Sequence, residues 1–370
     1  MKKTMIAWGC CTLALAGIAL PAHAQSSVTL YGVISVGLVY TNNTAGSRDY
    51  ALVSGVQQTP HWGLKGVEDL GGGYKTFFTL ENGFSITSGA LSNGGKLFGR
   101  KAFVGISTPD FGSITVGRQV DAMSDALFFY EAAAQFAAFG VPIGDNDNVF
   151  ETTRVSNAVR YSSHLYSGFQ FVGQYGFSND AGEFNNNSSK SASLTYTNGP
   201  FSAAIAYSEF LLPNSASNSN GAITDTYGVP VITTFASNVN RQQMFGLSGD
   251  YKLGAAQFTM MVTRSMFSYL QGAPGLSLTN YEPTFTYYVT PEALVGIGYI
   301  FTDGHTNNES PKWHQIDTGI DYFLSKRTDV FLVAVYQKAA GDAKFAQIYG
   351  NAPSTSRLQF SATVGIRHTF

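Results

Sequence analysis

Apolar and polar residues alternate with a period of two along much of this chain. Over residues 357–370, apolar side chains occupy most even positions and polar side chains most odd ones, ending at Phe370. A similar alternation recurs at 154–161, 244–251 and 315–322. A period of two puts successive side chains on opposite faces of an extended strand, so each segment predicts a β-strand with one apolar and one polar face.

Turn-forming residues divide the alternating segments into sixteen predicted strands. Seven short turns are expected at 69–73, 108–112, 166–168, 198–200, 252–255, 289–292 and 324–329. Eight longer polar connections alternate with them, at 41–57, 85–96, 120–151, 179–188, 212–239, 268–277, 304–310 and 340–356. Short turns at one rim and long loops at the other are typical of an antiparallel barrel of the bacterial outer membrane. The chain has no linker and no shift in composition, so we expect a single all-β domain.

The composition agrees with a barrel whose outer face meets lipid. Charged residues are 12% of the chain and hydrophobic residues 44%, whereas a soluble domain carries about a quarter of charged residues. Hydrocarbon requires every backbone amide to be paired, and a closed barrel satisfies this requirement. Several aromatic residues near strand ends suit interfacial belts, although each would also fit an ordinary half-buried strand: Tyr31, Tyr40, Trp62, Tyr161, Tyr251, Tyr281 and Phe370. The alternative, a soluble β-sandwich, would bury its apolar faces and carry more charge outside.

Residues 1–24 have the three parts of a secretory signal peptide. Lys2-Lys3 supplies the positive start, an uncharged and largely apolar segment follows over 4–20, and Ala22-His23-Ala24 offers a small-x-small cleavage site. A lone membrane anchor is the alternative, but the segment is short for a span. We therefore expect an exported mature chain of residues 25–370.

Removal of this peptide changes the chemistry of the chain. Both cysteines, Cys10 and Cys11, lie inside it, so the mature chain has no disulfide or thiol chemistry. The full chain has 22 basic and 24 acidic residues, and loss of Lys2 and Lys3 leaves 20 basic residues and a net charge of −4. This balance provides no basic footprint for nucleic acid, so no nucleic-acid partner is expected.

The third long connection, residues 120–151, is the candidate for narrowing the channel. A barrel of 16 to 18 strands leaves an aqueous passage unless something fills it. This connection carries an aromatic run at 127–130 together with Phe136 and Phe139. Those side chains need an apolar surface, so we expect the segment to fold inward against the wall; capping the barrel from outside is the alternative. Its acidic residues are Asp121, Asp125, Glu131, Asp145, Asp147 and Glu151.

Basic residues on neighbouring strands are expected to face this loop. An arginine facing lipid near the midplane costs about 2–4 kcal/mol, so such side chains should point into the lumen. Arg118 shares the parity of the apolar Ile114 and Val116, and a bulge or a strand end is needed to turn it inward. The predicted constriction residues are Arg100, Arg118, Arg154, His61 and Lys65 on the wall, opposite Asp145 and Asp147 on the loop. The alternative for each arginine, most of all for Arg160, is a wall hydrogen-bond network that never contacts the permeating solute.

Several segments of the mature chain resemble the trimeric general porins of Gram-negative bacteria, of the β-proteobacterial type. The matching segments are VTLYG at 28–32, HWGLKGVEDLG at 61–71, FGRKAFVG at 98–105, FGSITVGRQ at 111–119, GDNDN at 144–148 and the terminal Phe370. The resemblance covers the whole mature chain. Each segment alone is a weak signal, and their combination is specific.

The resemblance implies a sixteen-stranded barrel, a homotrimer in outer-membrane lipid, and a constriction loop facing basic wall residues. It also implies passive diffusion of ions and small hydrophilic solutes, with no cofactor. The family's motif arginines match Arg100, Arg118 and Arg154. Two positions depart from the family pattern, because His61 stands where an arginine is usual and Ser35 where an aspartate is common. Imidazole has a reference pKa of about 6.5, so one constriction charge becomes pH-dependent.

Three other function classes fit the sequence less well. A membrane-embedded hydrolase needs a histidine beside a nucleophile, but His164 and its neighbour Ser163 fall on opposite faces of a strand. No metal-binding or phosphate-binding motif occurs in the mature chain. A plugged receptor would need 22 strands, which this length excludes. A substrate-specific outer-membrane channel remains the alternative function, and a ladder of solute-binding residues in the loops would distinguish it.

Overall fold

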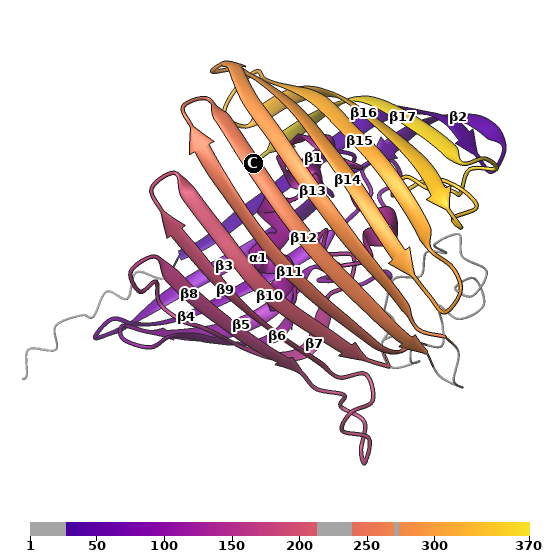
Figure 1. Ribbon diagram of the computed structural model, residues 1–370. Coiled ribbons are helices and arrows are strands. Elements are labelled where there is room, and N and C mark those ends of the chain that lie inside the picture. The colour runs from indigo at the N-terminus through magenta and orange to yellow at the C-terminus, as the bar shows by residue number, and fades with distance from the viewer. Residues whose placement is uncertain (1–26, 213–238, 270–273) are drawn as a thin grey trace, which may run out of the picture.

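The computed structural model describes residues 27–212, 239–269 and 274–370, which form one closed antiparallel sheet (Figure 1). Its strands are β1 (Ser27–Thr44), β2 (Ser47–Ser54), β3 (His61–Gly71), β4 (Tyr74–Gly83), β5 (Lys101–Thr108), β6 (Gly112–Gln119), β7 (Val155–Ser162), β8 (Phe169–Gly176), β9 (Ser189–Asn198), β10 (Phe201–Leu211), β11 (Val239–Leu253), β12 (Ala256–Tyr269), β13 (Leu276–Thr290), β14 (Ala293–His305), β15 (Pro311–Phe323), β16 (Thr328–Gly341) and β17 (Leu358–Thr369). The expected signal peptide, residues 1–24, lies outside the described residues, as does most of the connection at 212–239.

The first and last strands close the barrel. β1 pairs with β17 from Val33 opposite Thr369 to Thr41 opposite Ser361. On its other edge β1 pairs with β2 and then with β3, so these two segments together occupy one position in the ring. The seventeen segments of the described chain therefore make a barrel of sixteen strand positions, and the predicted fold class is confirmed.

The prediction that 41–57 forms one long loop is wrong. β1 continues to Thr44, a two-residue turn at Ala45 and Gly46 reverses the chain, and β2 follows. Both turn residues have positive φ, 52° and 99°, as tight hairpin turns that match strand twist require. The tip of the hairpin, 41–49, is polar on both faces and therefore gave no strand signal.

The two faces of the sheet differ as the alternation predicts. On β17, Gln359, Ser361 and Thr363 point inward and are buried, whereas Val364 and Ile366 are exposed on the outside. On the other strands, too, large apolar side chains make up the exposed outer face. A surface of this kind is stable against hydrocarbon. Among the described residues, no helix is long and apolar enough to cross a membrane.

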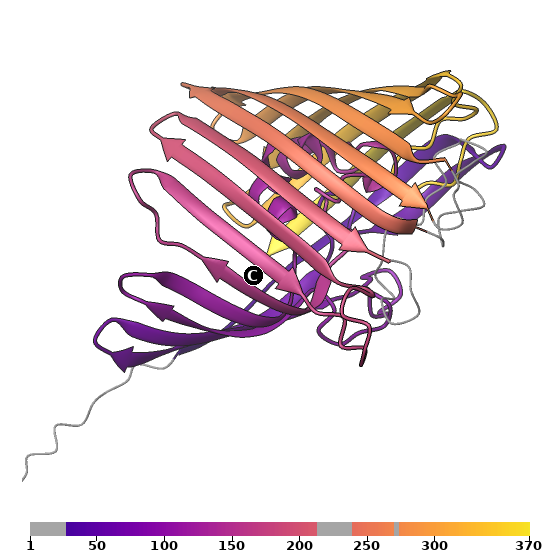
Figure 2. The same ribbon diagram turned by 60° about the horizontal axis from the view of Figure 1, so that its bottom comes forward.

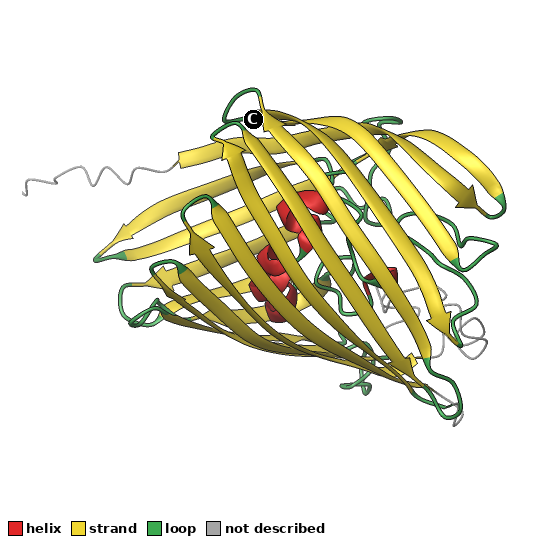
Figure 3. Ribbon diagram, turned by 45° about the horizontal axis from the view of Figure 1, so that its top comes forward, coloured by secondary structure: helices red, strands yellow, loops and turns green. Residues whose placement is uncertain are grey.

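The segment 120–151 folds into the barrel, as predicted. It forms α1 (Ala122–Leu127) and three short helical turns, η1 (Phe128–Tyr130), η2 (Ala133–Ala137) and η3 (Ile143–Asp145). Figure 2 shows this segment enclosed by the strands, and Figure 3 shows its helical turns in red inside the yellow wall. Asp121 caps α1 by accepting hydrogen bonds from the amides of Met123 and Ser124.

Apolar side chains attach this segment to the inner wall. Met123 and Leu127 pack with Met244 and Met261 of β11 and β12. Farther along, the Phe136 ring lies so close to the wall that a Cβ atom at Gly296 would be 2.3 Å from it. Because these apolar side chains are buried against the strands, the segment lies along the wall and not across the opening.

Candidate functional site

The inner segment and the opposite wall bound a cavity of about 370 Å³. Wall strands, the inner segment and the long connection after β16 all contribute to its lining. The lining residues are Gln57, Gln58, Thr59, His61, Glu81, Ser92, Asn93, Arg100, Lys101, Asp125, Phe128, Phe129, Phe150, Glu151, Thr152, Arg154 and Tyr349. Basic, acidic and aromatic side chains therefore share one water-accessible space.

Two of the predicted arginines line this cavity, and carboxylates hold both in place. Arg100, directly before β5, donates from Nε to Glu81 Oε1 at 2.7 Å, and its Nη2 lies 3.9 Å from Glu151 Oε2. Arg154, directly before β7, donates from Nη2 to Glu151 Oε2 at 2.9 Å. Burial and then the charge of Arg100 lower the pKa of Arg154 to about 10, so Arg154 remains a cation at neutral pH. Glu151 thus lies between two guanidinium groups.

Arg118 has the bulge that the sequence analysis requires. The register of β6 against β7 shifts between Gly117 and Gln119, and Gly117 has a φ of 135°. The guanidinium points inward but is buried beneath the cavity, where it donates to the carbonyl of Gly99 at 2.7 Å and to Ser156 Oγ at 2.8 Å. Its charge acts on the cavity from behind Arg154, whose carbonyl it also contacts.

His61 and Lys65 lie on β3 but differ in position. His61 lines the cavity, its Nδ1 donates to the carbonyl of Thr59 at 2.8 Å, and its Nε2 lies 4.0 Å from Glu81 Oε2. Lys65 is exposed outside the lining residues, with Nζ 5.4 Å above the Tyr31 ring. The structure therefore brings His61, Arg100 and Arg154 together and leaves Lys65 apart from them.

The expectation that Asp145 and Asp147 face the arginines is wrong. Both side chains are completely buried on the side of the inner segment that is turned away from the cavity. Asp145 accepts hydrogen bonds from the amides of Phe150 (3.0 Å) and Thr152 (3.1 Å). Asp147 accepts from Asn280 Nδ2 at 3.1 Å and from the Thr263 hydroxyl.

The physical reason lies in the tight backbone turn around these residues. Asp145 and Asn148 have positive φ values, 46° and 59°, and such turns leave amides without partners inside the chain. Carboxylates satisfy those amides better than water does in a buried place. The acidic side of the cavity is formed instead by Glu81, Asp125 and Glu151, and Asp125 is ion-paired with Arg160.

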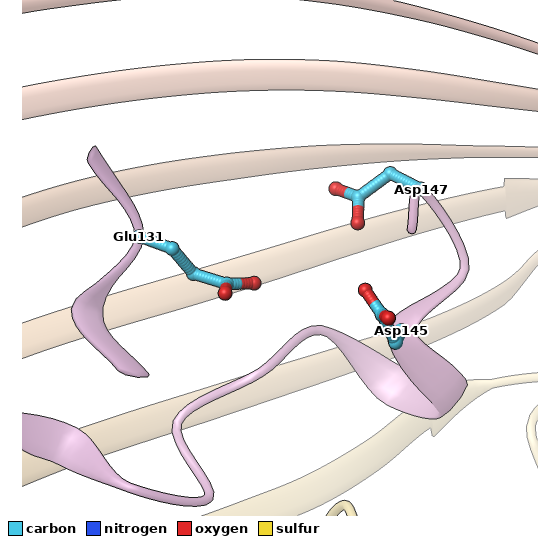
Figure 4. Close-up of side chains that lie close together, drawn as sticks. All are labelled: Glu131, Asp145 and Asp147. Carbon is cyan, nitrogen blue, oxygen red and sulfur yellow. The ribbon is translucent and has the colours of Figure 1, made fainter. Parts of the chain in front are cut away.

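Three acidic residues of the inner segment form a buried cluster close to the wall. Carboxylate oxygens of Glu131, Asp145 and Asp147 all lie within 4.8 Å of one another, and Figure 4 shows these three side chains pointing toward one another. Both oxygens of Glu131 lack a hydrogen-bond partner in the described part of the chain. Burial, followed by the charges of Glu282 and the two aspartates, raises the pKa of Glu131 well above 4.5. Burial among other carboxylates therefore favours the protonated form of Glu131 over a further buried charge.

The sequence analysis did not identify three residues that line the cavity: Glu81, Lys101 and Tyr349. Glu81 and Lys101 lie directly opposite each other on β4 and β5, a pairing that was available only once the strand register was known. Tyr349 comes from the connection between β16 and β17, and no local pattern places it beside residue 150. Asp125 and Glu151 were identified as loop acids, but their positions depend on how the loop folds.

The sequence is similar to those of known outer-membrane porins. The family model described as Gram-negative porin matches residues 11–342. An outer membrane porin protein of Bordetella pertussis is 30% identical over the full length of both chains, and a major outer membrane protein P.IB of Neisseria meningitidis is 27% identical, again over both full lengths.

The solved structures agree in fold. An anion-selective porin from Comamonas acidovorans superposes with a TM-score of 0.75 at 24% identity, covering 93% of this chain and 100% of that one. The OmpT protein of Vibrio cholerae superposes with a TM-score of 0.66 at 15% identity, covering 93% of this chain and 98% of that one. The sequence resemblance is thus confirmed over nearly the whole chain, and this chain belongs to the Gram-negative porin family.

Proposed function

We propose that the cavity lined by His61, Arg100 and Arg154 is the selectivity constriction of this porin and that it favours anions. As a porin of the outer membrane, the chain forms a water-filled channel for passive diffusion of ions and small hydrophilic solutes. The proposal adds where this channel discriminates between solutes and which charge it prefers.

The balance of charge around the cavity carries the proposal. Five cations line it or contact its lining residues: Arg100, Lys101, Arg118, Arg154 and Arg160. By the same criterion there are four carboxylates: Glu81, Asp125 and Glu151 line the cavity, and Asp145 accepts hydrogen bonds from the lining residues Phe150 and Thr152. With His61 neutral and all four carboxylates ionised, the excess is one positive charge. Rings of fixed charge in a narrow aqueous passage select ions of opposite sign. The structural neighbour from Comamonas acidovorans, which is an anion-selective porin, supports the same direction.

Lys101 is the best residue for a test. It lines the cavity and forms no ion pair within 4 Å among the described residues, although its charge acts on Glu81 directly opposite. Its removal leaves Glu81 ion-paired with Arg100. In planar bilayers under a salt gradient, the wild type should show a reversal potential of anion-preferring sign, and Lys101→Ala should shift it toward cations.

A matched control is Lys252→Ala. This lysine is exposed at the end of β11, away from the cavity, so its removal should leave the reversal potential unchanged. A cation-preferring wild type, or equal shifts in both variants, would place the selectivity elsewhere.

We also propose that the protein assembles as a homotrimer and that residues 1–24 are removed on export. The motif resemblance to trimeric general porins supports the first proposal, and the composition of the N-terminus supports the second. Crosslinking or mass measurement in detergent that found only monomers would refute the trimer. An intact mass of the outer-membrane protein that did not correspond to a start at Gln25 would refute the cleavage site.

A further inference from the structure

Four aromatic rings form a continuous row along one side of the cavity. The ring centroids of Phe129 and Phe128 are 5.3 Å apart, those of Phe128 and Phe150 are 6.2 Å apart, and those of Phe150 and Tyr349 are 5.4 Å apart. All four residues line the cavity. The row joins η1, the end of the inner segment and the connection after β16, which are distant in sequence.

The row remains open to the lumen instead of packing against the wall. Phe129 is 73% exposed, whereas Phe136 from the same segment is completely buried against β14 and β15. The row is also held in place, because the Tyr349 hydroxyl and Thr152 Oγ1 are hydrogen-bonded at 2.9 Å. Aromatic surface left in water costs free energy that a planar apolar ligand would recover. Passage of ions alone gives no reason for such a surface.

Cationic groups share this cavity with the rings. Ion pairs to Glu81 and Glu151 orient Arg100 and Arg154, and Lys101 forms no ion pair within 4 Å among the described residues. An incoming carboxylate would find at Lys101 an ammonium whose neighbour, Glu81, is already bound to Arg100. An incoming cation would find Glu81 and Glu151 already engaged.

We propose that this cavity is a binding subsite for aromatic carboxylates. The planar ring of the solute lies against Phe129 and the neighbouring rings, and its carboxylate interacts with Lys101 beside the two arginines. A cavity of about 370 Å³ is within the usual range of small-molecule sites. This inference rests on the proposed anion preference of the same cavity and adds the class of solute.

The test compares solutes of equal charge in single-channel recordings. Benzoate, cyclohexanecarboxylate and acetate are added in turn to a chloride background, and block of the chloride current is measured. Benzoate should block the wild-type channel more strongly than cyclohexanecarboxylate, because only a planar ring presents a face to the aromatic row, and acetate should block least. Phe129→Leu should weaken the block by benzoate about threefold to tenfold, as the loss of one aromatic pair predicts, with little effect on acetate.

Phe184→Leu is the matched control. Phe184 is 66% exposed but belongs to the connection between β8 and β9, outside the cavity. Benzoate should block the chloride current through this variant as strongly as through the wild type. Equal block by benzoate and cyclohexanecarboxylate in the wild type, or equal benzoate block in Phe129→Leu and Phe184→Leu, would overturn the inference. Stronger block by benzylammonium than by benzoate would also overturn it.

The anion preference and the subsite can fail separately. If the salt-gradient reversal potential shows no anion preference but Phe129→Leu still weakens benzoate block selectively, the proposed selectivity is wrong and the aromatic subsite stands. If the anion preference holds and benzoate blocks Phe129→Leu and Phe184→Leu equally, only the proposed subsite is wrong.

Discussion

Replacement of Glu131 by glutamine tests how the buried acidic cluster makes the stability of the protein depend on pH. Both carboxylate oxygens of Glu131 are buried without a partner in the described residues. Burial, then the charge of Glu282, then those of Asp145 and Asp147, raise the pKa of Glu131 well above 4.5. The folded protein therefore keeps a proton on Glu131 at pH values where the unfolded chain has released it.

Because folding takes up this proton, the free energy of unfolding falls as the pH rises. A carboxyl group whose pKa is raised by folding contributes fully below its unfolded pKa, near 4.5, and loses stability as the pH rises toward the folded pKa. One proton corresponds to a slope of about 1.4 kcal/mol per pH unit. Glutamine has a similar shape and no titrating proton. Glu131→Gln should therefore lose this slope and be more stable than the wild type at pH 8, with a smaller difference at pH 5.

Urea unfolding in phospholipid vesicles from pH 5 to pH 8 measures this slope. Trp313 is a suitable fluorescent reporter, because it is buried in the same apolar cluster as Ile143 of the inner segment. Glu183→Gln, which removes an exposed carboxylate on the connection between β8 and β9, should keep the wild-type slope. A slope in Glu131→Gln equal to that of the wild type, or a lower stability at pH 8, would refute the reasoning.

Three further changes have distinct expected outcomes. Joint replacement Asp145→Asn and Asp147→Asn should leave the reversal potential unchanged, because both side chains are buried, and should increase cleavage of the inner segment by proteases, because each lost charged acceptor costs about 1–3 kcal/mol. Gly296→Val should displace the Phe136 ring, which lies 2.3 Å from the added Cβ, and a changed single-channel conductance would report the shift of the inner segment. Acidification from pH 7.5 to pH 5 should move the reversal potential toward anions more in the wild type than in His61→Gln, because only the wild type gains a charge on the cavity wall; equal shifts would exclude His61 as a selectivity element.

The sequence by itself determined the architecture. A strand between lipid and lumen must alternate, so the pattern at 357–370 located β17 and predicted its inward face correctly. The same reasoning recognised that Arg118 required a bulge, and β6 has one at Gly117. It also predicted that the aromatic content of 120–151 would turn that segment inward. Each of these inferences depends on a local pattern that the solvent on either side of the wall imposes.

Only the tertiary structure decided which charges face the cavity. The sequence analysis chose Asp145 and Asp147 as the constriction acids and not Glu151, but turn amides and wall side chains bury the first two, and two arginines hold Glu151 in the cavity. Tyr349 enters the site across about two hundred residues of chain, through its hydrogen bond with Thr152. A side chain's partner depends on strand register, turn geometry and loop packing together, and these are long-range properties. Alternation identifies the face on which a residue lies, and the folded chain determines what that residue meets there.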